Sequence, residues 1–131
     1  MGAHPNVETT RQGYDAFSAG DLEAIRDRFS PDIVWHVGGT SPFSGDYKGI
    51  DEVFGFFGKI TQESGGTFKF DVQDILANDE RVVVLAHVTA ERNGKRLDQN
   101  TCNVHHVNAE GETTEFWSFP EDQAAGDAFW S

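Results

Sequence analysis

The sequence has a single cysteine, Cys102, so no disulfide can form within its 131 residues, which fits a reducing compartment. The start, Met1–Pro5, lacks the charged stretch followed by an apolar one that marks a signal peptide. No apolar run approaches the length of a membrane span. We therefore expect a cytoplasmic protein with no membrane partner.

Positive charge is also scarce. Ten basic residues stand against 22 acidic ones, and the formal net charge is −12. Such a chain repels a phosphate backbone, so we expect no nucleic-acid partner. The length fits one domain over residues 1–131, with a sizeable core but no room for a second domain.

Several motifs of catalysis and cofactor binding are missing. The sequence has no phosphate loop, nucleotide fingerprint, serine elbow or Cys/His spacing of a metal site. His105 and His106 are neighbours on a predicted strand and point to opposite faces, and His87 falls on the outer face. We predict neither a metal nor a cofactor.

What is present is a run of three predicted strands at the end of the chain, over about residues 81–92, 95–108 and 112–120. Asn93-Gly94 is a strong hairpin signal, because both residues tolerate the positive φ of a type I′ turn. Read as two-residue loops, this turn and Glu110-Gly111 set the register of all three strands. A slip of one residue in either turn would send every side chain to the other face.

These registers gather one set of side chains on a single face. The set is aliphatic on the first strand, polar on the second, and small or aromatic on the third. It consists of Val84, Ala86, Thr101, Asn103, His105, Phe116 and Ser118. An ordinary core would not collect three polar side chains in a row, whereas a cavity wall would, so we predict that the set lines one pocket.

The other face of these strands is too hydrophobic for free solvent. It carries Val83, Leu85, His87, Thr89, Asn100, Cys102, Val104, His106, Glu115, Trp117 and Phe119. A patch of this kind normally marks an interface, so we expect a homodimer through it. The alternative is that residues 122–131 fold back and cover the patch.

The first half of the chain is predicted to hold three helices. Helical spacing indicates helices that begin near Pro5, Asp21 and Gly49, and Pro31 should end the second. A short strand over residues 33–37, a long loop over 38–49 and an alternating strand from residue 68 complete the order. We expect an α+β domain with helices on one face of a curved sheet.

Several segments resemble the nuclear transport factor 2-like superfamily, and more narrowly its SnoaL-like, ketosteroid-isomerase-like proteins. They are Gly20–Ile25, Ser30–His36, Gly45–Gly49 and Phe116–Ala125, with Phe129-Trp130. The resemblance implies a cone-shaped fold, in which three helices pack on the concave face of a curved mixed or antiparallel sheet. The superfamily includes isomerases, cyclases, epoxide hydrolases, dehydratases and proteins that only bind or assemble, so the fold does not decide the function.

The resemblance places the roles of a steroid isomerase on this chain only in part. The carboxylate base falls at about Val37, which cannot take a proton. The tyrosine that holds the oxyanion falls near Gly13. Tyr14 is the next residue, so its side chain points about 100° further around the helix axis. The second oxyanion donor falls on Asn103, whose amide can still donate.

His105 and Asn103 are the candidates for chemistry. An unperturbed histidine titrates near neutrality, so His105 is a candidate general acid or base, with a satisfied core histidine as the alternative. Asn103, two residues away on the same face, would hold a carbonyl or oxyanion. His106 lies between Arg81 and Glu115 and is assigned to the outer face.

The helices and the first strand add further pocket residues. They are Tyr14, Trp35, Val37, Phe54 and Phe57. We predict that the pocket binds a small hydrophobic molecule, with isomerisation, cyclisation or hydrolysis by acid–base chemistry as candidate reactions. A non-catalytic ligand-binding or assembly module of the same fold is the alternative, and a cavity filled by aromatic rings would favour it.

A Δ5-3-ketosteroid should not be turned over appreciably, because Val37 stands where the isomerase base is expected. The acid–base contribution at stake is about 10²–10⁴-fold in rate. Absorbance of the conjugated product measures the rate, and efficient isomerisation that survives substitution of His105 would contradict this mapping.

Overall fold

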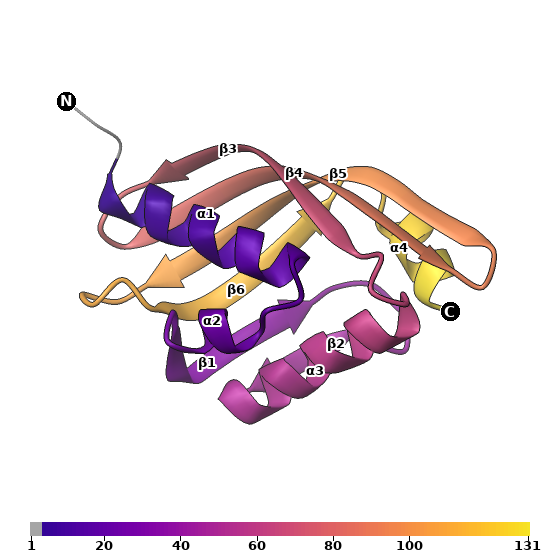
Figure 1. The fold of residues 1–131 in the computed structure, drawn as a ribbon, viewed down its shortest axis with the longest axis horizontal. Helices are drawn as coiled ribbons and strands as arrows, with labels where there is room; N and C mark the ends of the chain where they lie inside the picture. The colour runs from indigo at the N-terminus through magenta and orange to yellow at the C-terminus, as the bar shows by residue number, and fades with distance from the viewer. Residues whose placement is uncertain (1–3) are drawn as a thin grey trace.

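The computed structural model describes residues 4–131, which form one six-stranded sheet and four helices (Figure 1). Met1–Ala3, part of the segment considered for a signal peptide, lie outside the described residues. The elements in chain order are α1 (Pro5–Ser18), α2 (Glu23–Arg26), β1 (Phe29–Val37), β2 (Gly45–Lys48), α3 (Ile50–Glu63), β3 (Lys69–Ala77), β4 (Arg81–Arg92), β5 (Lys95–Val107), β6 (Thr113–Pro120) and α4 (Gln123–Trp130).

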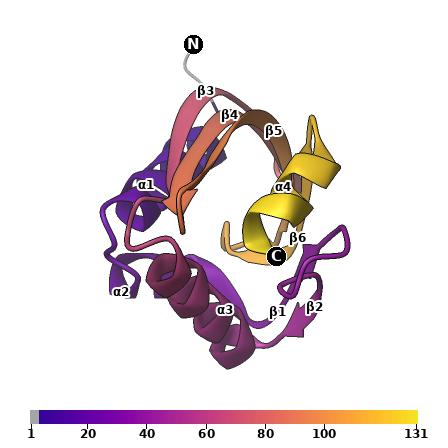
Figure 2. The ribbon, with the colours of Figure 1, turned by 90° about the vertical axis from the view of Figure 1, so that its right-hand side faces the viewer.

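The sheet has the strand order β2-β1-β6-β5-β4-β3. β1 runs parallel to β6, and the other neighbouring strands are antiparallel, so the sheet is mixed. It curves around the interior without closing into a barrel, and α1 and α3 lie across its concave side (Figure 2). The predicted α+β fold with a curved sheet is confirmed, and α4 is a fourth helix beyond the three that were predicted.

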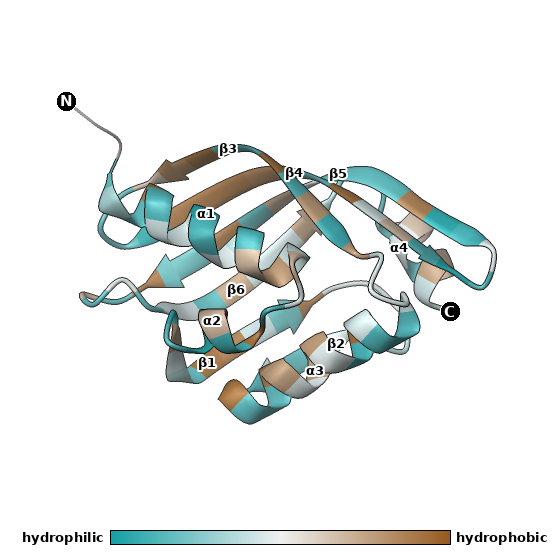
Figure 3. Cartoon of the chain, in the orientation of Figure 1, coloured by the Kyte–Doolittle hydropathy of each residue, from teal (hydrophilic) through white to brown (hydrophobic). Residues whose placement is uncertain are grey.

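The β4–β5 hairpin has the register that its turn predicts. Asn93 and Gly94 have φ values of 51° and 78°, as a type I′ turn requires. As a result Val84 pairs with Asn103, and Asn103 pairs in turn with Ser118 on β6. Burial alternates along β4 and β5 accordingly, although β4 contains a continuous hydrophobic stretch (Figure 3).

The β5–β6 connection reaches the predicted register by a different route. Val107 pairs with Thr113, which leaves a longer loop than the predicted two-residue turn. An irregularity next to Val107 then restores the expected pairing of His106 with Glu115. A bulge of one residue therefore compensates for the longer loop.

Two predicted segments in the first half differ from the structure. The second helix is only Glu23–Arg26, and β1 already begins at Phe29, so Pro31 lies within a strand. Its position is tolerated because the pairing of β1 with β6 is interrupted between Phe29 and Val34. The predicted loop contains the short edge strand β2, whose glycine- and serine-rich surroundings concealed it.

The C-terminal segment does not cover the outer face of the sheet. Phe129 of α4 packs instead against Val88, Ala90 and Leu97, on the inner side of β4 and β5. On the outer face Leu85 is 40% exposed and Phe119 57% exposed. Among residues 4–131, no helix is both long and apolar enough to cross a membrane.

We propose that this outer face of β4, β5 and β6 pairs with the same face of a second copy around a two-fold axis. Trp117→Glu should then give monomers or aggregates, because it places a charge in the apolar patch. Light scattering at high micromolar concentration measures the mass, with Ala24→Glu on the exposed surface of α2 as the control. A strictly monomeric wild-type protein would contradict the proposal.

Candidate functional site

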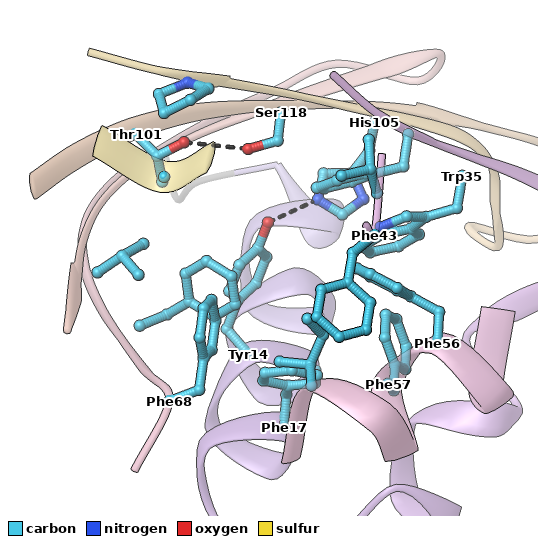
Figure 4. Close-up of a pocket in the computed structure, with 18 of the residues that line it drawn as sticks. Tyr14, Phe17, Trp35, Phe43, Phe56, Phe57, Phe68, Thr101, His105 and Ser118 are labelled. Carbon is cyan, nitrogen blue, oxygen red and sulfur yellow. Dashed lines mark hydrogen bonds between the residues drawn. The ribbon is translucent and has the colours of Figure 1, made fainter. Parts of the chain in front are cut away.

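A cavity of about 200 Å³ lies between the concave face of the sheet and the helices (Figure 4). Its wall is mainly aromatic. The rings that line it belong to Tyr14, Phe17, Phe29, Trp35, Phe43, Phe56, Phe57, Phe68, Phe70, Phe116 and Trp130. The rings surround the cavity without filling it, so it can accept a small apolar molecule.

The aromatic wall is held together by ring-to-ring packing. Trp35 stacks on Phe116 with 3.5 Å between the ring centroids, and Phe57 meets the indole edge-on at 4.9 Å. Trp35 comes from β1, Phe116 from the neighbouring strand β6 and Phe57 from α3. One side of the cavity is therefore fixed by a helix and two paired strands.

A series of buried hydrogen bonds runs along the wall next to Phe116, whose ring packs edge-on against His105. The Asn103 amide Nδ2 donates to Tyr14 Oη at 2.9 Å, and Tyr14 Oη lies 2.9 Å from His105 Nε2. His105 Nδ1 lies 3.2 Å from Thr113 Oγ1. All four side chains are buried, and α1 contributes the tyrosine at the centre of the series.

The same series of hydrogen bonds continues toward β6. Thr101 Oγ1 donates to Asn103 Oδ1 at 3.3 Å and lies 3.1 Å from Ser118 Oγ. Figure 4 shows the Thr101–Ser118 and Tyr14–His105 contacts on the cavity wall. Each of these buried side chains thus finds a polar partner, as the low dielectric of an interior requires.

The hydrogen bonds favour one arrangement of the protons. Because Tyr14 Oη accepts from the Asn103 amide, its own hydrogen is free to donate to His105 Nε2. In that arrangement Nε2 accepts and Nδ1–H donates to Thr113 Oγ1. The contacts thus favour a neutral imidazole with its proton on Nδ1.

Burial also controls the ionisation of this pair. Burial lowers the pKa of His105 from 6.5 to about 3, because a charged imidazolium would be poorly solvated. Burial likewise raises the pKa of Tyr14, and the hydrogen bond from Asn103 offsets only part of the rise. Both groups are neutral at pH 7, which corrects the expectation that His105 titrates near neutrality.

Eight of the predicted site residues line the cavity. They are Tyr14, Trp35, Val37, Phe57, Thr101, His105, Phe116 and Ser118. The structure thus brings His105 together with Tyr14, which the sequence placed among the pocket residues of the helices.

Four predicted site residues lie outside the lining, namely Asn103, Val84, Ala86 and Phe54. Tyr14 packs in one cluster with Val84 and Ala86, and its hydroxyl oxygen accepts the hydrogen bond that the Asn103 amide donates. A helix therefore covers this part of the sheet face and keeps Asn103 out of the cavity lining. Phe54 instead lies under the Arg26 guanidinium, 4.4 Å from its ring centroid.

Sequence reasoning missed several lining residues. Phe56 could have been found, because Val53, Phe56, Phe57 and Ile60 have the i, i+3, i+4, i+7 spacing of one helix face. Phe17 follows Tyr14 by three residues on α1 and shares its face by the same rule. The lining residues of α4 had no such signal, since that helix was not predicted.

The titratable groups outside the cavity behave differently from His105. His36 lies between Asp46 Oδ1 at 2.7 Å and Glu115 Oε2 at 2.6 Å. Its burial lowers the pKa, but the hydrogen bonds to Glu115 and Asp46 outweigh this and raise it. Within residues 4–131, no three His, Cys, Asp or Glu side chains gather as a metal site.

His105 should stay neutral far below pH 6.5. Its pKa in the folded protein is below that of the unfolded chain, so its contribution to stability is complete above about pH 6.5. This contribution is lost as the pH falls through about 3. Imidazole ¹⁵N shifts between pH 8 and 4.5 should show a protonated Nδ1 and a bare Nε2.

His36 is the internal control for this titration, because its raised pKa makes it charge at a higher pH than a free histidine. A His105 resonance that titrates near pH 6.5 would contradict the assignment.

Comparison with known proteins identifies the family. A family model described as a SnoaL-like domain matches residues 10–116. An uncharacterised protein of Mycobacterium tuberculosis is 32% identical over 127 residues, which cover 96% of each chain. Among solved structures, Bal32a, from a soil-derived mobile gene cassette, is 38% identical with a TM-score of 0.92 over 96% of both chains.

A more distant solved structure has the same fold. IdmH of Streptomyces antibioticus, proposed to be a polyketide cyclase, has a TM-score of 0.73 over 90% of this chain and 93% of its own. At 21% identity, this likeness shows the fold alone. An ntf2-like protein of Burkholderia pseudomallei is 25% identical, with a TM-score of 0.84 over 96% of this chain and 97% of its own. With the family match and the likeness to Bal32a, it shows that the protein belongs to the SnoaL-like domain family of the nuclear transport factor 2-like superfamily.

Proposed function

We propose that the protein binds a small, mostly apolar carbonyl compound in this cavity and promotes its enolisation, the step shared by many isomerisations and cyclisations. The observation that carries the proposal is the placement of Tyr14 Oη. Asn103 and His105 hold it at 2.9 Å each on the wall of an aromatic cavity. A neutral hydroxyl with two fixed partners is suited to a carbonyl oxygen.

Tyr14 is the group that would hold the oxyanion. When its hydrogen turns from His105 to a ligand carbonyl, the Asn103 amide still donates to Oη and makes the phenol a stronger donor. A donor that is fixed in a dry site stabilises developing charge more than one in water. Asn103 therefore acts as a positioning residue behind the tyrosine.

His105 is the group that would move the proton. As the Tyr14 hydrogen turns away, the Nε2 lone pair is released at the cavity wall and can accept a proton from the carbon beside the carbonyl. The pKa of about 3 reflects the cost of a lone positive charge in this interior. An enolate held by Tyr14 would offset that cost, because an opposite charge nearby favours the imidazolium. Nε2 then returns the proton to another carbon.

The size of the cavity limits the ligand. An engineered apolar cavity of about 150 Å³ holds benzene, so about 200 Å³ suits a molecule of one or two rings. The family assignment and the fold shared with IdmH support small-molecule chemistry of this type.

Binding without catalysis is a second candidate function. Among the described lining residues, Asp127 is the one carboxylate, and it belongs to α4. Val37 lines the cavity where a steroid isomerase has its base, so the neutral His105 is left as the base. A protein that only binds its ligand needs no base stronger than this neutral histidine.

Exchange of the α-protons of 2-tetralone in deuterium oxide, followed by NMR, tests the proposal. The wild-type protein should accelerate exchange, and Tyr14→Phe should reduce the acceleration by about 10²–10³-fold, as loss of an oxyanion donor does. Tyr47→Phe is the matched control, because that phenol donates to the Phe43 carbonyl at 2.7 Å and does not line the cavity.

Undiminished exchange in Tyr14→Phe would contradict the assigned role. Saturable binding of 2-tetralone without exchange would reject enolisation and support the binding function.

A further inference from the structure

The cavity has a second polar region, where α1 meets the segment that follows α2. Besides the aromatic rings, the wall includes Thr9, Thr10 and Gly13 of α1, together with Arg28 and Thr113. These residues are contiguous. Arg28 Nη1 donates to the Thr9 carbonyl at 3.3 Å, and the Thr113 amide donates to the Arg28 carbonyl at 2.9 Å.

Arg28 is the one basic residue among the described lining residues. Its guanidinium is always charged and carries five hydrogen-bond donors. Nη2 donates to Gln12 Oε1 at 2.9 Å, whereas Nε is buried and has no partner among residues 4–131. A buried donor without a partner is uncommon in a folded protein and calls for an explanation.

Arg28 also makes no ion pair within the described residues, although acidic residues outnumber basic ones by 22 to 10. Arg26, Arg81, Arg92 and Arg96 each find a carboxylate, whereas Arg11, like Arg28, has none among the described residues. The Arg28 guanidinium is held by neutral oxygens, so its charge has no carboxylate partner within residues 4–131.

The Arg28 side chain packs directly against α1 at a glycine. A Cβ atom at Gly13 would lie 3.4 Å from Arg28 Cδ, which is van der Waals contact. Gly13 precedes Tyr14, and Thr113 binds the Arg28 backbone as well as the His105 ring. Arg28 is thus connected to the Tyr14–His105 pair through Gly13 and Thr113.

We infer that Arg28 recognises an anionic substituent, so that the ligand is a one- or two-ring carbonyl compound bearing a carboxylate. This inference rests on the proposed function for the site of the carbonyl oxygen, and it adds the charge of the ligand. A carboxylate accepts from several guanidinium donors at once, and such charge-assisted bonds are about twice as strong as neutral ones. The anion would also compensate the charge that the protein leaves unpaired.

Two probes of matched shape test the inference by isothermal titration calorimetry. Benzoylformate carries a ring, a ketone and a carboxylate, and 1-phenylpropane-1,2-dione replaces the carboxylate with a neutral acetyl group. The wild-type protein should bind benzoylformate at least about tenfold more tightly, as expected for hydrogen bonds to a charged group. High salt should reduce this preference but not the binding of the dione.

Arg28→Gln should abolish the preference and leave the affinity for the dione unchanged, since an amide still reaches a carbonyl but carries no charge. Arg26→Gln is the control, because it removes the same charge from a residue outside the cavity lining. Arg28→Lys keeps the charge and should keep part of the preference, even if the glutamine variant is less stable. Thermal unfolding of each variant shows whether it is folded.

The outcomes separate this inference from the proposed function. If the dione binds and Tyr14→Phe weakens it, but benzoylformate is not preferred, the proposed function stands and the role of Arg28 is rejected. A preference that persists in Arg28→Gln rejects that role as well. If neither probe binds the wild-type protein, the proposed function and the inference both fail.

Discussion

The register of the β4–β5 hairpin is the constraint on which the site depends. With Asn93 and Gly94 in a type I′ turn, Asn103 and His105 face the interior and His106 faces outward. A displacement of one residue would bring Val104 and His106 inside and leave the tyrosine of α1 without either partner. The chemistry of the cavity is thus set by two residues at the far end of the hairpin.

The pKa of a histidine is shifted in opposite directions in the interior and on the outer face. Inside, His105 is neutral and held by hydroxyl groups, and burial keeps its pKa near 3. Outside, His36 lies between two carboxylates that raise its pKa, and it stacks on Trp117 with 5.1 Å between ring centroids. The protein thus separates a neutral, buried series of hydrogen bonds from charged pairs at its surface.

A buried polar chain in an aromatic cavity is costly unless it is complete. An unsatisfied buried donor or acceptor costs about 1–3 kcal/mol, so one missing partner would offset much of what the chain contributes. From Thr113 through His105, Tyr14 and Asn103 to Thr101, each link is made. The guanidinium of Arg28 is the exception, with a buried Nε that no described residue accepts from.

The strand register and the inner face could be predicted because turn chemistry and alternation are local properties. Two-residue periodicity cannot show which part of a sheet face a helix covers. For this reason Asn103, Val84 and Ala86 were assigned to the cavity, although Tyr14 covers them. The pKa of His105 was likewise out of reach, since it depends on burial by segments distant in sequence.

Helix α4 shows the same limit at the other end of the cavity. Its segment was recognised only as a possible cover for the outer face, yet Phe129 packs on the inner side of β4 and β5. The choice between the two faces depends on long-range packing and leaves no mark in the local pattern of Gln123–Trp130.

A crystal structure with 2-naphthol, a planar analogue of the 2-tetralone enolate, tests the central claim most directly. The account predicts the naphthol oxygen about 2.6–3.0 Å from Tyr14 Oη, within hydrogen-bond distance, with both rings among the aromatic side chains. A naphthol oxygen bound instead by Gln123 or Asp127 of α4, with the Tyr14–His105 bond untouched, would contradict it.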